Sequence, residues 1–309
     1  MWCSRDSKLL MIFFLLIVGV FCQAQYHPQY SQYMFNGLAL NPAYAGSQEV
    51  LNLALLHRNS QWGNGIEGAP ATYTFSGDFP LRNPNLALGV LVFDDIISIF
   101  RQTGAYFTYA YRVRTSETGK LSFGLQAGFN SCREDNSRIK LFDPDDPIFS
   151  NRLLHVFMPN VGAGVYYYTQ NFFAGLSIPQ FLTYLPQRAD SYSGKLSFSN
   201  TMLYSGIIIP MNREFKIKPS TLLQYTEKSF HIDLNCNVMM FREKFDLGAS
   251  WRSNNTLVGM FQFKVKSLCI GYAYEYALKK PSAINTSHEI MLRYNFKIMV
   301  DAVNPIFIR

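Results

Sequence analysis

Histidine and glutamate stand side by side near the C-terminal end of the chain, at His288-Glu289. This pair begins a zinc-protease motif when a second histidine follows on the same helix face, three positions after the glutamate. That position is Leu292, and the local pattern is that of a strand, which would place residues four apart too far from each other to share one ion. The pair therefore does not predict zinc catalysis.

A cluster of acidic residues, Asp143, Asp145 and Asp146, is of a type that could bind calcium. Two prolines interrupt it, and it lacks the glycine and the terminal glutamate of an EF-hand loop, so a solvated acidic loop is the interpretation we favour. No nucleophile is spaced to work with the isolated histidines His57, His155 and His231. We predict no catalytic residue, no metal site, no cofactor and no enzymatic activity.

The five cysteines do not form a recognisable site. Cys3 and Cys22 fall within a predicted export signal, which leaves Cys132, Cys236 and Cys269 in the rest of the chain. An odd, widely spaced set is neither a disulfide framework nor a zinc motif. A bridge between Cys236 and Cys269 is one alternative, and unpaired apolar residues are the interpretation we favour.

The composition is poor in charge and rich in aromatic side chains. Hydrophobic residues make up 48% of the chain and charged residues 16%, with 19 Tyr and 26 Phe. This composition suits a barrel whose outer face meets lipid between two aromatic girdles, although composition alone leaves a soluble all-β protein open. The net charge of +7 is scattered, and no run of basic residues predicts nucleic-acid binding.

The N-terminus carries a secretion signal. Arg5 and Lys8 precede an apolar run over residues 9–21, which is too short for an ordinary membrane helix. Cleavage after Ala24 is the site we favour, and a lipoprotein cut before Cys22 is the alternative. No later stretch is long and apolar enough for a membrane helix. We predict a signal peptide over residues 1–24 and an exported protein.

Beyond residue 50 apolar and polar residues alternate with period two, as in residues 121–130, so successive side chains point to opposite faces of strands. Turn sequences of Gly, Asn and Ser separate several segments, at 117–119, 170–171 and 253–255. About 14 strands are predicted, at 50–59, 71–79, 86–94, 103–114, 119–131, 158–169, 171–179, 200–209, 214–226, 229–241, 244–253, 256–266, 267–278 and 286–298. Asp94 and Asp95 are interpreted as turn residues after the third strand.

Alternation alone does not separate a soluble sandwich from a membrane barrel. Export without a membrane helix, strands near ten residues long and the aromatic content favour an all-β, transmembrane antiparallel β-barrel over residues 50–309. The long connections at 133–157 and 179–199 are candidates for external loops, because barrels of this type have short periplasmic turns.

The polar face of the predicted strands should line the barrel lumen. The charged residues on it are of both signs, which indicates a plugged barrel held by salt bridges rather than a wide pore. We assign these side chains to the lumen: Asp233, Asp246, Arg252, Lys264, Lys266, Glu275, Glu289 and Arg293. A lumen of about 14 strands is too wide to be filled by wall side chains alone, so an N-terminal arm or a client polypeptide is expected inside it.

That arm is predicted over residues 25–49, where the aromatic residues do not follow strand spacing. Asn41-Pro42 and Ala45-Gly46 mark turns in it. Packing in the lumen and capping of the periplasmic mouth are both open from the sequence.

The arm also carries a resemblance to a known family. It is similar to the PorP/SprF family of Bacteroidetes type IX secretion system membrane proteins, as is the closing strand around His288 and Glu289, which continues through Leu292, Tyr294 and Phe296. The residues of this signature are Tyr30, Ser31, Gln32, Tyr33, Met34, Phe35, Asn36, Asn41, Pro42, Ala43, Tyr44, Ala45, Gly46, Gln61, Trp62, Gly68, Ala69, Pro70 and Thr72. They are candidates for binding a partner or for plugging the barrel.

The resemblance implies an outer-membrane barrel that binds a secreted or surface-anchored client with a type IX sorting domain, such as an adhesin, and contacts other type IX components. Neither role follows from composition or periodicity. A passive outer-membrane porin is the alternative function. Lipid of the outer membrane and a protein client are therefore the expected partners, and nucleic acid is not.

Overall fold

The computed structural model describes residues 30–60, 68–135, 153–187, 191–198, 200–226, 229–278 and 286–296. Three short 3-10 helices come first: η1 (Tyr33–Phe35), η2 (Gly37–Ala39) and η3 (Pro42–Tyr44). The strands follow as β1 (Leu51–Asn59), β2 (Ala71–Pro80), β3 (Leu86–Ile97), β4 (Phe100–Arg114), β5 (Lys120–Asp135), β6 (Leu153–Tyr168), β7 (Phe172–Ile178), β8 (Leu182–Gln187), β9 (Ser191–Leu196), β10 (Thr201–Ile207), β11 (Ile209–Pro210), β12 (Phe215–Thr226), β13 (Ser229–Met240), β14 (Phe245–Arg252), β15 (Thr256–Val265), β16 (Leu268–Ala277) and β17 (Thr286–Phe296).

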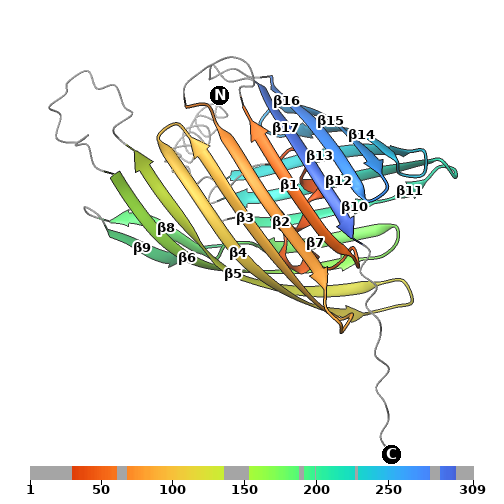
Figure 1. Ribbon diagram of the computed structural model, residues 1–309, viewed down its shortest axis with the longest axis horizontal. Helices are drawn as coiled ribbons and strands as arrows, with labels where there is room; N and C mark the ends of the chain where they lie inside the picture. Colours follow the sequence, from red (N-terminus) through yellow and green to blue (C-terminus); the bar gives the residue numbers. More distant parts are fainter. Residues whose placement is uncertain are drawn as a thin grey trace, which may run out of the picture.

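The strands close into a single antiparallel barrel (Figure 1). Pairing of β1 with β17 and of β10 with β12 completes the ring. The short β11 pairs with β12 in the register that β10 has already set, so it continues β10, and β8 pairs only with β9. The predicted barrel of about 14 strands is confirmed as a closed 14-strand barrel.

The two faces of the wall differ in polarity in the way a membrane barrel requires. Outward-facing Phe107 and Leu125 are 57% and 64% exposed, whereas Thr108 and Ser122 face the lumen and are fully buried. An apolar outer face and a polar lumen are the arrangement of barrels in lipid, the reverse of a soluble sandwich. Among the described residues there is no helix whose length and apolar content would let it span a membrane.

The connections separate by length onto the two ends of the barrel. One end, called here the turn end, carries the short connections 81–85, 115–119, 169–171, 211–214, 241–244 and 266–267. The other end, called the loop end, carries the longer connections 60–70, 136–152, 179–200 and 278–285, together with short ones. Both connections predicted to be external loops therefore lie at the same end.

Three details of the predicted boundaries were wrong. Strands β5 and β6 extend to Asp135 and back to Leu153, which shortens the predicted connection at 133–157, and the β8–β9 hairpin occupies the predicted loop at 179–199. Cross-strand pairing supplied the difference, because β5 and β6 remain in register along their whole length. The acidic residues 143–146 lie outside the described residues.

Two assignments of charged residues were also wrong. Asp94 and Asp95 do not form a turn, since β3 continues past them in register with β4. Asp95 instead accepts a hydrogen bond from the Thr72 hydroxyl at 2.5 Å, inside the barrel. Lys266 lies in the turn between β15 and β16 with a positive φ of 53°, so it is not a lumen-facing strand residue.

Candidate functional site

The described part of the N-terminal arm, residues 30–49, lies in the lumen, enclosed by the strands (red in Figure 1). Its side chains are among the most deeply buried in the molecule: Gln32 and Ala43 are 0% exposed, and Leu38 is 2% exposed. Both polar and apolar arm residues are buried, so the arm must match the wall in hydrogen bonding as well as in shape.

The sequence of the arm explains why it forms short turns rather than a strand. Pro42 starts η3 and cannot donate a backbone hydrogen bond, and the Asn41 side chain caps this turn by accepting from the Ala43 amide at 2.8 Å. Gly37 lies under the Tyr44 ring, where a Cβ atom would collide. Gly46 has a φ of +69° and allows the chain to turn toward β1.

A carboxylate on β17 holds the beginning of the arm near the loop end. The two carboxylate oxygens of Glu289 accept from the backbone amides of Ser31 and Gln32, each at 2.7 Å. The Ser31 hydroxyl donates to Glu275 at 2.8 Å. These charge-assisted bonds fix both the direction and the register of the arm.

An ion cluster on the wall supports this contact. Arg252 pairs with Asp233 at 3.1 Å and with Glu275 at 3.0 Å, and it donates to the carbonyl oxygen of Tyr30 at 2.8 Å. Arg58 pairs with the same Glu275 at 3.1 Å. Three of the charged residues assigned to the lumen thus meet one another and the arm.

Further contacts hold the rest of the arm down to the turn end. The Asn41 amide donates to the carbonyl oxygens of Val165 and Leu176, at 3.0 and 3.4 Å, across the β6–β7 pair. The Gly46 amide donates to Asp78 at 2.7 Å. Because these contacts lie progressively closer to the turn end, the arm runs along the lumen instead of capping one mouth.

Wall glycines provide space for the arm. A Cβ atom at Gly124 would collide with the backbone of Pro42 and Ala43, and one at Gly164 would collide with the Asn41 side chain. Gly271 lies equally close to Gln32. These strand glycines are places of close backbone approach, which is a recognised role of glycine in strands.

The remaining signature residues differ in where they lie. Tyr33 receives a hydrogen bond from Asn235, Phe35 from Arg293 at 3.0 Å, and Asn36 from Ser76 at 3.0 Å. Burial raises the pKa of the Tyr30 and Tyr33 phenols, so both rings stay neutral.

Outside the arm, the signature residues lie apart from it. Gly68 has a φ of +81° and, with Ala69 and Pro70, forms the approach to β2, whereas Gln61 and Trp62 lie outside the described residues. The neighbours His288 and Glu289 do not share a site. His288 contacts the Tyr272 hydroxyl at 2.8 Å and packs against the half-exposed Tyr274, whereas Glu289 points into the lumen.

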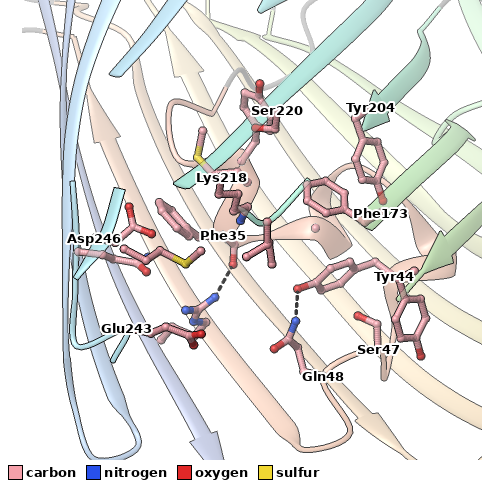
Figure 2. Close-up of a pocket in the computed structure, with 18 of the residues that line it drawn as sticks. Phe35, Tyr44, Ser47, Gln48, Phe173, Tyr204, Lys218, Ser220, Glu243 and Asp246 are labelled. Carbon is pink, nitrogen blue, oxygen red and sulfur yellow. Dashed lines mark hydrogen bonds between the residues drawn. The ribbon is translucent and has the colours of Figure 1, made fainter. Parts of the chain in front are cut away.

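The arm does not fill the whole lumen. A cavity of about 380 Å³, called here the vestibule, lies at the turn end between the arm and the strands β7, β10 and β12–β17 (Figure 2). One wall is aromatic and contains Phe35, Tyr44, Tyr166, Tyr168, Phe173 and Tyr204. The facing wall is charged and contains Lys218, Glu243, Lys244, Asp246, Lys264 and Arg293.

Three residues predicted to face the lumen, Asp246, Lys264 and Arg293, therefore line the vestibule rather than the ion cluster. Lys218 was missed by the sequence analysis. It has the polar-face position in the predicted strand 214–226, but its neighbour Pro219 obscured the alternation. The tyrosines of the aromatic wall were missed as well, because tyrosine occurs on both faces of these strands.

Metal binding finds no support within the described residues, where no three His, Cys, Asp or Glu side chains gather around a common point. The three described cysteines are free: Cys236 is exposed on the outer face and Cys269 is buried on the lumen side, so the alternative of a bridge between them was wrong. The chemistry that this lumen can perform is binding, through hydrogen bonds, charge and aromatic contacts.

Comparisons with known proteins place this geometry among membrane barrels. Residues 22–294 match the family model described as type IX secretion system membrane protein PorP/SprF. A search of curated proteins found no match. Among solved structures, the CymD monoaromatic hydrocarbon channel aligns with a TM-score of 0.53 and 14% identity, over 85% of this chain and 93% of that chain.

Two further solved structures show weaker likenesses. The toluene transporter TodX of Pseudomonas putida aligns with a TM-score of 0.48 and 9% identity, over 88% of this chain and 95% of that one. The outer membrane protein Omp33 of Acinetobacter baumannii aligns with a TM-score of 0.46 and 9% identity, over 80% and 99%. At these identities, CymD supports the barrel fold and none of the three transfers a substrate.

Proposed function

The chain belongs to the PorP/SprF family of type IX secretion system membrane proteins, and from that premise we propose that it is an accessory barrel which binds a client protein and helps to secrete or anchor it. The proposed client is a secreted or surface-anchored protein, such as an adhesin with a type IX sorting domain. We further propose that residues 1–24 are a cleaved signal peptide and that the loop end faces the cell exterior.

The observation that carries the proposal is the occupied lumen. The arm is held in the lumen from Glu289 near the loop end to Asp78 near the turn end. A barrel whose own chain fills its interior is suited to holding a partner rather than to conducting solutes freely. The large loop-end connections and the vestibule then remain as surfaces for partners, including other type IX components.

Deletion of the gene in its own bacterium tests the proposal. Comparison of the surface and secreted proteomes of the wild-type and deletion strains should show loss of at least one protein with a sorting domain, restored by the intact gene. Crosslinking of the complemented strain should recover that same client with the barrel. Unchanged export and attachment of every sorting-domain protein would refute the proposal.

The runner-up function is a passive porin, and the barrel fold that the chain shares with the CymD channel is the observation that favours it. Purified protein in planar bilayers separates the two functions. A steady open conductance from the wild-type protein alone would favour the porin. We expect a closed barrel, because the arm occupies the conducting path.

A further inference from the structure

The vestibule contains hydrogen-bonding groups that the protein leaves unused. Side-chain atoms that are buried and have no partner within the described protein include Tyr168 Oη, Ser220 Oγ, Gln262 Nε2, Arg293 Nε and Asn295 Oδ1. All five residues line the vestibule, and the set includes both donors and acceptors. Buried polar groups in folded proteins are normally hydrogen-bonded, so this concentration indicates a site for a polar ligand.

A buried ammonium group lies in the same cavity. Lys218 Nζ is 5.5 Å from the centre of the Phe35 ring and 5.6 Å from that of Phe173, and among the described residues it forms no ion pair (Figure 2). Cation–π contacts stabilise this charge only partly, at roughly 0.5–2 kcal/mol. Lys218 therefore keeps its capacity to pair with an anion.

The acidic residues of the vestibule are already engaged. Asp246 accepts from Asn237 at 2.8 Å, and Glu243 pairs with Lys216 at 2.5 Å. Arg293 uses one terminal nitrogen on the Phe35 carbonyl oxygen and directs the other toward Cys269 Sγ, which leaves its Nε unpartnered. The unused charge in the cavity is thus positive.

The shape and chemistry of the walls define the ligand further. The Tyr166 ring stacks on Tyr168 and on Tyr204, with centroids 5.2 and 5.8 Å apart, and forms a flat apolar wall opposite Lys218. Such a wall fits an aromatic or large apolar side chain. The nearby carboxylates disfavour a doubly charged phosphate, and the arm closes the cavity toward the loop end, so a short segment would enter from the turn end.

We propose that the vestibule binds a short peptide segment that presents a carboxylate to Lys218 beside an aromatic or large apolar side chain on the tyrosine wall. The carboxylate belongs either to an acidic side chain or to a chain terminus, which have the same chemistry. This inference goes beyond the proposed role in secretion and does not require it, because the purified barrel alone tests it.

Fluorescence anisotropy with the full-length protein in detergent measures this binding. Three labelled probes are used: Gly-Gly-Phe-Glu amide, Gly-Gly-Phe-Gln amide, and Gly-Gly-Phe with a free carboxylate. We expect at least one carboxylate probe to bind about ten-fold more tightly than the Gln probe, because a desolvated charge pair is lost with the neutral analogue. The ratio of the two carboxylate probes identifies the source of the carboxylate.

Variants of one lysine then assign the effect to the vestibule. Lys218→Met should remove the preference for the carboxylate probe, and Lys218→Arg should keep it. Lys266→Met is the matched control, since Lys266 lies in a turn at the same end of the barrel and does not line the cavity. Heat-modifiable gel migration confirms that each variant is folded.

Several outcomes would overturn the proposal. Equal binding of the acidic and neutral probes, or an unchanged preference in Lys218→Met, would show that Lys218 does not receive a carboxylate. A loss of binding in Lys266→Met as large as in Lys218→Met would indicate non-specific charge attraction. Displacement of the peptide by uncharged chitobiose at similar concentrations would indicate a sugar site instead.

Discussion

The two halves of the lumen differ in how completely the protein satisfies its own polar groups. On the arm side, Glu289 receives two backbone amides and Asn41 bonds to two strand carbonyls. On the vestibule side, Lys218 has no ion pair among the described residues, and Tyr168 and Asn295 have buried atoms without partners. The first half is fitted to an occupant that belongs to the same chain, and the second is fitted to an occupant that does not.

The glycines of the wall show the same difference in shape. Gly124 and Gly164 meet the arm so closely that a side chain could not be added, whereas Gly259 on β15 has no atom near its missing Cβ. Close packing and full hydrogen bonding on one side imply that the arm is a structural part of the barrel. If so, changes on that side should affect stability, and changes on the vestibule side should not.

The largest effect is expected for Gly124→Leu. The new side chain would occupy the space of the Pro42 and Ala43 backbone, which has no freedom to move between β5 and β6. Overpacking usually costs about 1–3 kcal/mol, and a collision with backbone costs more, so the arm should leave the lumen. Planar-bilayer recordings should then show open-channel conductance that the wild-type protein lacks.

Gly259→Leu is the matched control for this prediction, because it adds the same side chain where nothing lies within 4 Å. It should assemble and remain closed like the wild-type protein. A closed Gly124→Leu barrel with normal assembly would mean that the arm adapts to the wall, and the comparison between the two halves would lose its structural basis.

The strand pattern could be predicted from the sequence, and the fit of the arm could not. Alternation identified all 14 barrel strands, because each strand has one apolar and one polar face regardless of its neighbours. It also placed Glu289 and Arg293 on the lumen side. Which wall residue meets which arm residue depends on contacts between positions more than a hundred residues apart, which local periodicity does not encode.

Gly124 and Lys218 illustrate what remained hidden. Gly124 is one of several strand glycines, and nothing in its neighbourhood in the sequence distinguishes a socket for Ala43 from the open surface at Gly259. Lys218 follows Lys216 at strand spacing, but only the closed barrel brings it against Phe35 and Phe173.

The second prediction is that Glu289→Gln releases the beginning of the arm. Glutamine can accept from only one of the two amides, and its own N–H groups face the other. Hydrogen bonds to a charged group contribute about 1.5–3 kcal/mol, so local opening should become at least about ten-fold more frequent. Hydrogen exchange measured by mass spectrometry should show faster exchange at Ser31 and Gln32, with β17 itself still protected.

The exposed Glu214 provides a control for the loss of one carboxylate, since it pairs with Arg242 in a turn away from the arm. Glu214→Gln should leave exchange in the arm unchanged. Equal protection of Ser31 in Glu289→Gln and in the wild-type protein would show that the carboxylate does not hold the arm.

A smaller effect is expected for Asn41→Ala. This change removes the cap on η3 and two bonds to the β6–β7 pair, but the surrounding apolar contacts of the arm remain. Loss of a cap costs about 0.5–2 kcal/mol, so exchange at Ala43 and Tyr44 should rise while the barrel stays closed to ions. Asn212→Ala, which removes a cap in a turn at the barrel end, should leave these amides unaffected.

The smallest effect on the arm is expected for Lys218→Met, and this result separates the two halves most directly. The methionine keeps a flexible apolar stem between Phe35 and Phe173, and the change removes a buried charge that has no ion pair among the described residues. Removing such a charge often leaves stability the same or raises it. Exchange across residues 30–49 and the thermal midpoint of heat-modifiable migration should therefore match the wild-type values. A loosened arm in Lys218→Met would mean that the lysine supports the plug through its ring contacts. The vestibule would then be part of the same structural unit as the arm, and its free charge would need no external ligand to explain it.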